Sequence, residues 1–354
     1  MVRRKATSVD VAREAGVSQS AVSRSFTPGA SVAEETRERV LAAADRLGYR
    51  PNAIARSLIT RRSQIIAVAV SYLHNQFYPE LVQGLSAAAQ ARGYHILLFT
   101  SGEGKAADRE LMRCLDYQID GLVLASVSLS SEIASQCMQA GIPVVMVNRV
   151  SDEPTASKVT GANLEGGRQI AHFLVAGGHK RIAYLSGIEG TSTNRDRYAG
   201  FRRGLQEAGA RLHGHAVGDY DSAKAAHAAE TLMNSAEPPD AIFCANDHMA
   251  LGVMEHLRAG LGLRIPQDVS IVGFDDVRAA GWPSYSLTTF SQSVDAMTEA
   301  TSMALFRAID AAVEGERLPP VHIELSGELL VRGSARVPAG FVGRTWSVNE
   351  NVPA

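Results

Sequence analysis

Residues 7–26 read TSVDVAREAGVSQSAVSRSF, and this stretch decides the fold of the N-terminal part of the chain. Thr7 or Ser8 can cap a first helix, Gly16 can end it in a left-handed conformation, and Ser18 can cap a second helix. We predict these helices over residues 9–15 and 19–26. Two short helices joined by a tight turn are typical of a helix-turn-helix, whose second helix enters the major groove of DNA.

A third helix is predicted over residues 34–47, where apolar side chains share one face and Gly48 follows as a stop signal. The next segment, Asn52 to Leu58, is too short to be a stable helix alone in water. It would need a partner or a ligand to become ordered, as a hinge that folds on DNA does. We therefore predict an all-α head, residues 1–50, followed by a hinge helix and linker, residues 51–63.

The charges of the chain are divided unevenly. The 354 residues carry a formal net charge of −2, but residues 1–62 carry +6 and the remaining 292 residues carry −8. A small basic head on a large acidic body indicates that the head meets a polyanion. The sequence contains no apolar run of transmembrane length and no secretory signal, so we expect a cytoplasmic protein. Three scattered cysteines argue against a disulfide scaffold or a zinc site.

From Gln64 onward, short apolar runs alternate with helical patterns such as residues 78–92 and 166–176. The predicted strands are residues 65–70, 96–100, 121–125, 143–147, 181–186, 241–245 and 269–274. Strands that alternate with helices form parallel sheets covered by helices. The number of such units predicts an α/β core of two doubly wound parallel-sheet lobes with a cleft between them.

The run from Val9 to Leu58 resembles the lactose/galactose-repressor (LacI/GalR) family of bacterial transcription regulators. The matching pieces are DVA at 10–12, AGVS at 15–18, VSR at 22–24, TRERV at 36–40, LGYRPN at 47–52 and ARSL at 55–58. Two positions depart from the family pattern. The segment 25–27 is bulkier than the usual ending, and Ala33 stands where the family caps its third helix with Ser or Thr. We expect Ser31 or water to take that role.

The resemblance implies which residues of the head contact DNA. Gln19, Ser20 and Arg24 would read base edges in the major groove, in keeping with the bidentate contacts that Arg and Gln make. The phosphate contacts would come from Thr7, Ser18, Ser23 and Asn52, and the hinge would add Ala55 and Leu58. Leu58 would insert into the minor groove and bend the duplex. The expected partner is a near-palindromic operator bound by a homodimer.

The resemblance also implies a core like that of the periplasmic sugar-binding proteins, in which the chain crosses three times between the lobes. The expected crossings lie near residues 160, 290 and 323. The predicted core is 64–340, with a first lobe of 64–160 and 291–322, a second lobe of 161–290 and 323–340, and a tail of 341–354.

Ligands of doubly wound folds bind at the carboxyl ends of strands. By the resemblance, the effector-binding residues are Ser71, Phe77, Ser126, Asn148, Arg197, Tyr220, Asn246, Asp275 and Gln292. Arg197 and Asp275 would bind hydroxyls, and Tyr220 would form an aromatic wall. Arg149 and Arg195 stay open, because each suits either an acidic group on the effector or the rim of the site. Asp247 and Asp276 are first interpreted as turn or cap residues.

We find no catalytic constellation, and the His213-Gly214-His215 run reads as loop histidines without companion metal ligands. No catalytic residue, metal or cofactor is therefore predicted. The sequence predicts a DNA-binding transcriptional regulator, with repression as the expected mode, controlled by a small molecule such as a sugar or sugar acid. A cytoplasmic solute-binding protein or a sugar-processing protein using the same cleft is the alternative. A gel shift and a turnover assay separate these functions.

Overall fold

The structure is a computed structural model that describes residues 6–27, 29–50, 62–100, 112–127 and 130–348. The chain divides into two compact units, residues 1–63 and 64–354, called here the head and the core. The predicted hinge contacts Asn52, Ala55 and Leu58 lie outside the described residues.

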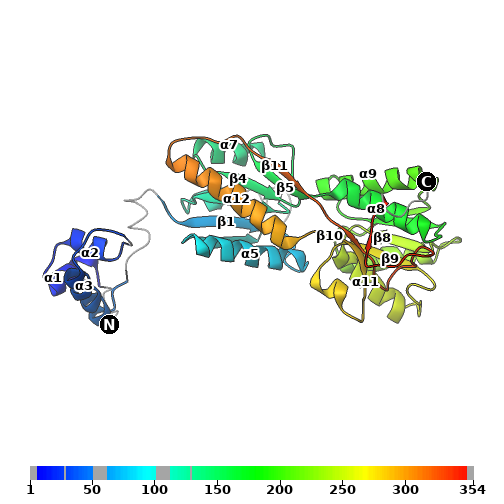
Figure 1. Ribbon diagram of the computed structural model, residues 1–354, viewed down its shortest axis with the longest axis horizontal. Helices are drawn as coiled ribbons and strands as arrows, with labels where there is room; N and C mark the ends of the chain where they lie inside the picture. Colours follow the sequence, from blue (N-terminus) through cyan, green and yellow to red (C-terminus); the bar gives the residue numbers. More distant parts are fainter. Residues whose placement is uncertain (1–5, 28, 51–61, 101–111, 128–129, 349–354) are drawn as a thin grey trace. The chain divides into compact units, whose positions relative to one another are not determined.

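The head contains the predicted helix-turn-helix (Figure 1). Its helices are α1 (Ser8–Ala15), α2 (Gln19–Ser25) and α3 (Glu34–Leu47). A capping box begins α1, because the Thr7 hydroxyl accepts from the Asp10 amide and the Asp10 carboxylate accepts from the Thr7 amide. Gly16, with φ of 65°, ends α1, and the Ser18 side chain caps α2. Val11, Val22 and Val40 are the larger buried side chains of the small apolar core that these helices share.

The start of α3 differs from the prediction. Ala33 holds the N-cap position, and no described side chain, that of Ser31 included, caps the helix there. The prediction of Ser31 as the cap is therefore wrong. Two acidic residues in the first turn interact favourably with the helix dipole. The Arg37 guanidinium in addition donates to the carbonyl groups of Ser25 and Ala30, which holds the preceding loop.

The first lobe of the core is built on a six-stranded sheet in the order β11-β5-β4-β3-β1-β2, and every neighbouring pair is parallel. Its strands are β1 (Ile65–Val70), β2 (His95–Thr100), β3 (Gly121–Ala125), β4 (Val144–Val147), β5 (Ser157–Gly161) and β11 (His322–Leu325). The helices described in this lobe are α5 (Phe77–Ala91), α7 (Ser131–Gln139) and α12 (Val294–Val313). Strands β3 and β4 are buried along their length, which explains their unbroken apolar sequences.

The second lobe has a seven-stranded sheet in the order β13-β12-β10-β9-β8-β6-β7, parallel except at β12. Its strands are β6 (Ile182–Ser186), β7 (Gly214–Val217), β8 (Ala241–Cys244), β9 (Ser270–Asp275), β10 (Thr288–Ser291), β12 (Leu329–Leu330) and β13 (Thr345–Trp346). Its helices are α8 (Asn163–Ala176), α9 (Ser192–Glu207), α10 (Ser222–Met233), α11 (Asp247–Ala259) and the 3-10 helix η1 (Arg278–Gly281).

Several short strands were not predicted from the sequence. Strands β5, β7, β10, β11 and β13 carry polar or mixed sequences without an apolar run, so their pattern resembles loops, and β12 is apolar but only two residues long. The assignment of His215 to a loop is accordingly wrong. His215 lies on β7, where its ring stacks on Tyr184 and Tyr198 at centroid distances of 5.8 and 5.3 Å. His213 does precede the strand, and no His, Cys, Asp or Glu cluster suited to a metal exists among the described residues.

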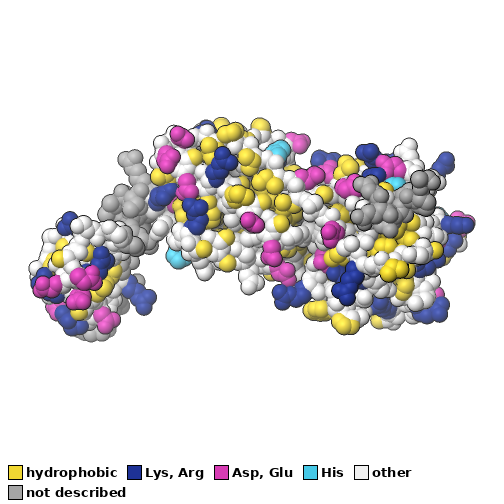
Figure 2. Space-filling view, viewed as in Figure 1, with side chains coloured by type: hydrophobic (Ala, Val, Ile, Leu, Met, Phe, Trp, Pro, Cys, Tyr) yellow, Lys and Arg dark blue, Asp and Glu magenta, His cyan; other side chains and the backbone are white. Residues whose placement is uncertain are grey.

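The chain passes between the two lobes after β5, after β10 and after β11 (Figure 1). These connections bring the carboxyl ends of strands from both sheets to one region of the core. Figure 2 shows basic and acidic side chains intermixed over the visible face of the core. In the part of the chain that the structure describes, none of the helices combines the length and apolar character needed to cross a membrane.

Glycines bring helices α8 and α9 into close contact and so fix the position of Arg197 on α9. A Cβ atom on Gly167 would overlap the Arg197 carbonyl group, and one on Gly200 would overlap the Leu164 carbonyl group. Only residues without a side chain allow these two helix backbones to approach this closely. The start of α9 is thereby held against α8, which places the Arg197 side chain at the junction of the lobes.

His179, which follows α8, makes the stability of the core depend on pH. Its side chain is buried, and its Nδ1 atom accepts a hydrogen bond from Arg336. Burial and the Arg336 charge lower the pKa of His179 to about 4, although Asp240 opposes this shift. Because the imidazole of the unfolded chain has a higher pKa, the unfolded state binds a proton first as the pH falls.

We predict that the free energy of unfolding falls by about 2 kcal/mol on this account between pH 7 and pH 5. Urea titrations followed by tryptophan fluorescence measure it, since Trp282 and Trp346 both lie in the core. In the His179→Gln variant, the decrease in the free energy of unfolding between pH 7 and pH 5 should be smaller by about 2 kcal/mol. An identical pH dependence in both proteins would contradict a neutral buried imidazole.

Candidate functional site

The head exposes one polar face of α2. Ser18, Gln19, Ser20, Ser23 and Arg24 are all exposed, as expected of residues that meet a ligand outside the head. The Arg24 side chain has no hydrogen bond or ion pair with any described residue. Its guanidinium is therefore available for an acceptor such as a base edge.

Local hydrogen bonds hold several of the predicted DNA contacts in place. Gln19 Nε2 donates to Ser8 Oγ at 2.9 Å, and the hydroxyls of Ser18 and Ser20 lie 2.9 Å apart. The Thr7 hydroxyl donates to the Asp10 carboxylate as part of the capping box. These exposed bonds orient the side chains at one end of α2, and each contributes only about 1 kcal/mol that contact with a ligand can replace.

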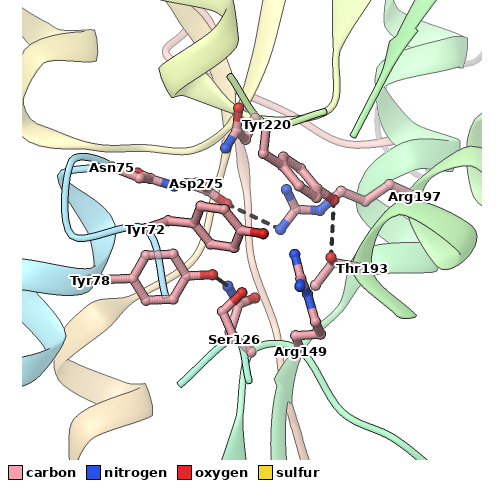
Figure 3. Close-up of a pocket in the computed structure, with 11 residues that line it drawn as sticks. Tyr72, Asn75, Tyr78, Ser126, Arg149, Thr193, Arg197, Tyr220 and Asp275 are labelled. Atoms are coloured by element: carbon pink, nitrogen blue, oxygen red, sulfur yellow. Dashed lines mark hydrogen bonds and ion pairs between the residues drawn. The ribbon is translucent and has the colours of Figure 1, made fainter. Parts of the chain in front are cut away.

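The core encloses a small polar pocket between the carboxyl ends of its two sheets (Figure 3). Its lining residues are Tyr72, Asn75, Tyr78, Ser126, Asn148, Arg149, Thr193, Arg197, Tyr220, Asn246 and Asp275. The enclosed volume is about 20 Å³, which is room for about one water molecule. A larger ligand can enter this site only if the lobes or the lining side chains move apart.

Six predicted effector contacts meet at this pocket, namely Ser126, Asn148, Arg197, Tyr220, Asn246 and Asp275. Ser71, Phe77 and Gln292 are not among its lining residues, and their predicted contacts with the effector stay predictions. Ser71 is buried directly after β1, and Phe77 is 1% exposed in the apolar core of its lobe. Gln292 contacts a lining residue, because its Nε2 donates to the Asp275 carboxylate at 2.7 Å.

The pocket is also lined by Tyr72, Asn75, Tyr78 and Thr193, which were not predicted from the sequence, and by Arg149, whose role was left open. Tyr72 and Asn75 lie between β1 and α5, and Tyr78 lies in the first turn of α5, so their position after a strand end was the available signal. Thr193 lies in the first turn of α9, where its sequence gave no signal.

A buried ion pair forms the centre of the second lobe's side of the pocket. Arg197 Nη2 lies 3.1 Å from Asp275 Oδ1, and both side chains are at most 3% exposed. Arg197 also donates to Asn163 Oδ1 and to the Ala245 carbonyl group, and its guanidinium stacks 3.7 Å from the Phe274 ring centre. Burial raises the pKa of Asp275, while Arg197 opposes that shift. The pair thus joins α8, α9 and the ends of β8 and β9.

Tyr220 forms one wall of the pocket. Its hydroxyl lies 3.0 Å from Thr193 Oγ1, and its side chain is 8% exposed. Gly187 lies behind the ring, and a Cβ atom there would overlap it. The glycine therefore leaves the space that the aromatic ring occupies.

The first lobe contributes polar atoms that lack partners. Asn148 Nδ2 donates to the Tyr78 hydroxyl at 2.9 Å, but Asn148 Oδ1 is buried without a hydrogen bond among the described residues. The Nε atom of the adjacent Arg149 is likewise unpartnered. Burial raises the pKa of the Tyr78 hydroxyl, so it remains neutral. Because unpartnered buried polar atoms are costly, these two atoms mark where a ligand would bind.

Unusual backbone conformations also gather here. Among the described lining residues, Tyr72, Ser126, Asn148, Tyr220 and Asp275 have positive φ, from 57° to 119°. Residues with side chains pay a steric penalty in this region and keep such angles only where their surroundings enforce them. Their concentration at one pocket is typical of a functional site.

The two lobes touch directly beside the pocket. The Val150 amide of the first lobe donates to Ser192 Oγ of α9 at 2.9 Å. His74, between β1 and α5, faces His248 of α11 with ring centroids 5.1 Å apart. The described core is therefore closed around its polar centre.

Comparisons with known proteins agree with both units. Residues 8–52 match the bacterial regulatory proteins of the lacI family, and residues 63–309 match the periplasmic binding proteins and sugar binding domain of the LacI family. The chain belongs to the LacI family. The transcriptional repressor PurR of Vibrio vulnificus is 33% identical over 324 residues, which are 90% of this chain and 97% of that protein.

Solved structures of LacI-family proteins share the fold. A complex of the regulator CelR with cellobiose is 31% identical, with a TM-score of 0.68, and the match covers 93% of this chain and all of the other. A lac repressor dimer bound to operator and an anti-inducer is 27% identical, with a TM-score of 0.80 and coverage of 94% and 99%. The protein is thus a DNA-binding transcriptional regulator with an effector-binding core, and the predicted fold class is confirmed.

We predict that Arg197→Met lowers the free energy of unfolding by about 3–5 kcal/mol, because it leaves Asp275 as a buried charge without its partner. Urea titration with tryptophan fluorescence measures the change. The double variant Arg197→Met/Asp275→Asn should regain part of the loss, since it removes the unpaired charge as well. A single variant as stable as the parent protein would contradict the central role of this pair.

Proposed function

We propose that this LacI-family protein is a repressor whose homodimer binds a near-palindromic operator, and that a polar small molecule in the core pocket controls this binding. One observation carries the proposal: a single chain combines an exposed polar recognition helix with an enclosed pocket centred on the Arg197–Asp275 pair. We propose that the protein acts in the cytoplasm, because a regulator must reach the DNA that it binds.

On DNA, α2 would lie in the major groove, with Gln19, Ser20 and Arg24 toward base edges. Thr7, Ser18 and Ser23 would contact phosphates together with Asn52. Ala55 and Leu58 stay predictions for the hinge. In a dimer, two copies of α2 would meet successive major grooves, which supports a near-palindromic operator.

In the core, the effector would be a sugar or sugar derivative. Ion-paired groups such as Arg197 and Asp275 can fix hydroxyl geometry, and Tyr220 offers a ring face. Because a hexose exceeds the enclosed volume of about 20 Å³, binding would require the lobes to open and close at the three connections between them. The head is joined to the first lobe at β1, so lobe movement would alter how the two heads of a dimer are held. Coupling of about 1–3 kcal/mol is typical.

Binding without catalysis fits the same pocket. The lining carboxylate, Asp275, accepts hydrogen bonds from both Arg197 and Gln292, so it is engaged in holding the site. The cysteines at 114, 137 and 244 are buried, and burial raises the pKa of Cys137 to about 11, which keeps its thiol protonated. We therefore propose that the protein is not an enzyme.

We predict that Arg24→Ala weakens binding to the selected operator by about 10–100-fold, because a bidentate base contact supplies about 1–3 kcal/mol. Arg13→Ala is the matched control, since it removes the same charge from the exposed side of α1. Fluorescence anisotropy with an operator found by binding-site selection measures both variants. The selected consensus should change in a Gln19→Ala/Ser20→Ala variant and stay the same in Arg13→Ala. An unchanged consensus in both would exclude α2 as the reading helix.

A further inference from the structure

Among the described residues, Arg149 has no counter-charge, unlike the other guanidinium group of the pocket. It follows Asn148 at the end of β4 and is only 7% exposed. No carboxylate of the described residues lies within 4.0 Å of it, and its Nε atom has no hydrogen-bond partner there. The contacts that the structure does show are with two aromatic rings, Tyr72 at 5.5 Å and Tyr220 at 5.8 Å.

The charges around the pocket do not balance. Among the described residues, its lining includes two guanidinium groups and one carboxylate, and Asp275 is already paired with Arg197 at 3.1 Å. Asp247 is buried nearby but does not line the pocket, and its carboxylate accepts from Thr289 Oγ1 and from the Val277 amide. The pocket therefore carries a net positive charge that belongs to Arg149. A buried cation without a partner is unfavourable until an anion reaches it.

Figure 3 shows the Arg149 side chain pointing into the space between Tyr72, Tyr220 and Arg197. Beside it, Asn148 Oδ1 is an acceptor without a donor. Arg149 Nε can donate to an anionic group, and Asn148 Oδ1 can accept from a hydroxyl. A ligand that carries both groups next to each other would satisfy both atoms. Neutral polyols supply the hydroxyl group but not the anionic group.

We propose that the effector is a hydroxylated acid, with a carboxylate or phosphate group that pairs with Arg149 and a hydroxyl that donates to Asn148. The acid group lies between the rings of Tyr72 and Tyr220, and further hydroxyls meet the Arg197–Asp275 pair. This inference rests on the proposed function, because it assigns the chemistry of the same effector. Charge-assisted bonds to a buried guanidinium would select acids over their neutral counterparts.

Arg195 provides the matched control. Its side chain is 61% exposed, it is ion-paired with Asp196 at 2.9 Å, and it is not among the lining residues of the pocket. Arg195→Met and Arg149→Met therefore remove the same charge by the same substitution, one at the surface and one in the pocket.

The test titrates the full-length protein with matched probes and follows the unfolding temperature by tryptophan fluorescence. The probes are glucose, glucuronate and glucose 6-phosphate, and the corresponding galactose series. We expect an acid to bind at least about tenfold more tightly than its neutral sugar.

The variants test whether Arg149 causes this preference for the acid. Arg149→Met should abolish the preference, Arg149→Lys should retain part of it, and Arg195→Met should leave it intact. Without any probe, Arg149→Met should raise the unfolding temperature by about 2 °C or more, since it removes an unpaired buried charge.

Three results would overturn the inference: a neutral sugar that binds as tightly as its acid, an acid preference that survives Arg149→Met, or no acid binding together with a lower unfolding temperature of Arg149→Met. If no probe binds but Arg149→Met is stabilised, the unpaired cation is supported.

Operator affinity, measured on the same samples, separates this inference from the proposed function. An acid that binds through Arg149 without changing operator affinity contradicts the proposed function alone. A neutral sugar that changes operator affinity equally in the parent protein and Arg149→Met contradicts the acid preference alone.

Discussion

The buried pair of Arg197 and Asp275 is the interaction on which the pocket depends. One guanidinium links the start of α8, through Asn163, to the carbonyl of Ala245 after β8 and to the carboxylate at the end of β9. Gln292, at the start of the crossing that leads from β10 back to the first lobe, also donates to this carboxylate. Removing two charges from water is costly, and an apolar pair of similar volume would often be at least as stable. The pair is therefore best explained by what it presents to a ligand, and its cost explains why so many polar partners surround it.

The first lobe faces this pair with a different chemistry. It supplies Arg149 and Asn148, whose Nε and Oδ1 atoms have no hydrogen-bond partner among the described residues. One lobe thus holds a charge pair that is already balanced, and the other holds a charge that is not. A ligand that balances it would contact both lobes at once, and this is the condition for a ligand to bias the angle between them. Tyr72 and Tyr220, one from each lobe, flank the same space.

Local signals explain which parts could be predicted from the sequence. The head was predictable because Thr7, Gly16 and Ser18 act within a single turn of their helices, and the buried strands were predictable from unbroken apolar runs. From the residues alone, the pocket was predictable where a polar residue ends or follows such a strand, as Asp275 does, whereas Arg197 and Tyr220 were predicted from the family resemblance. Phe77 and Tyr78 are adjacent aromatic residues at the start of α5, and only tertiary packing decides which one reaches the pocket. The role of Arg149 depends on the absence of a carboxylate from distant segments, which no local pattern records.

Control of operator binding by the angle between the lobes can be tested without knowing the effector. His74 and His248 face each other across the lobes, and the cysteines at 114, 137 and 244 are buried, so the variant H74C/H248C can be cross-linked selectively by a short bifunctional maleimide. The measurement is operator affinity by fluorescence anisotropy before and after cross-linking, with each single-cysteine variant treated in the same way as a control. We expect locking the lobes to change operator affinity at least about fivefold. Equal affinity in the free and cross-linked proteins would contradict it.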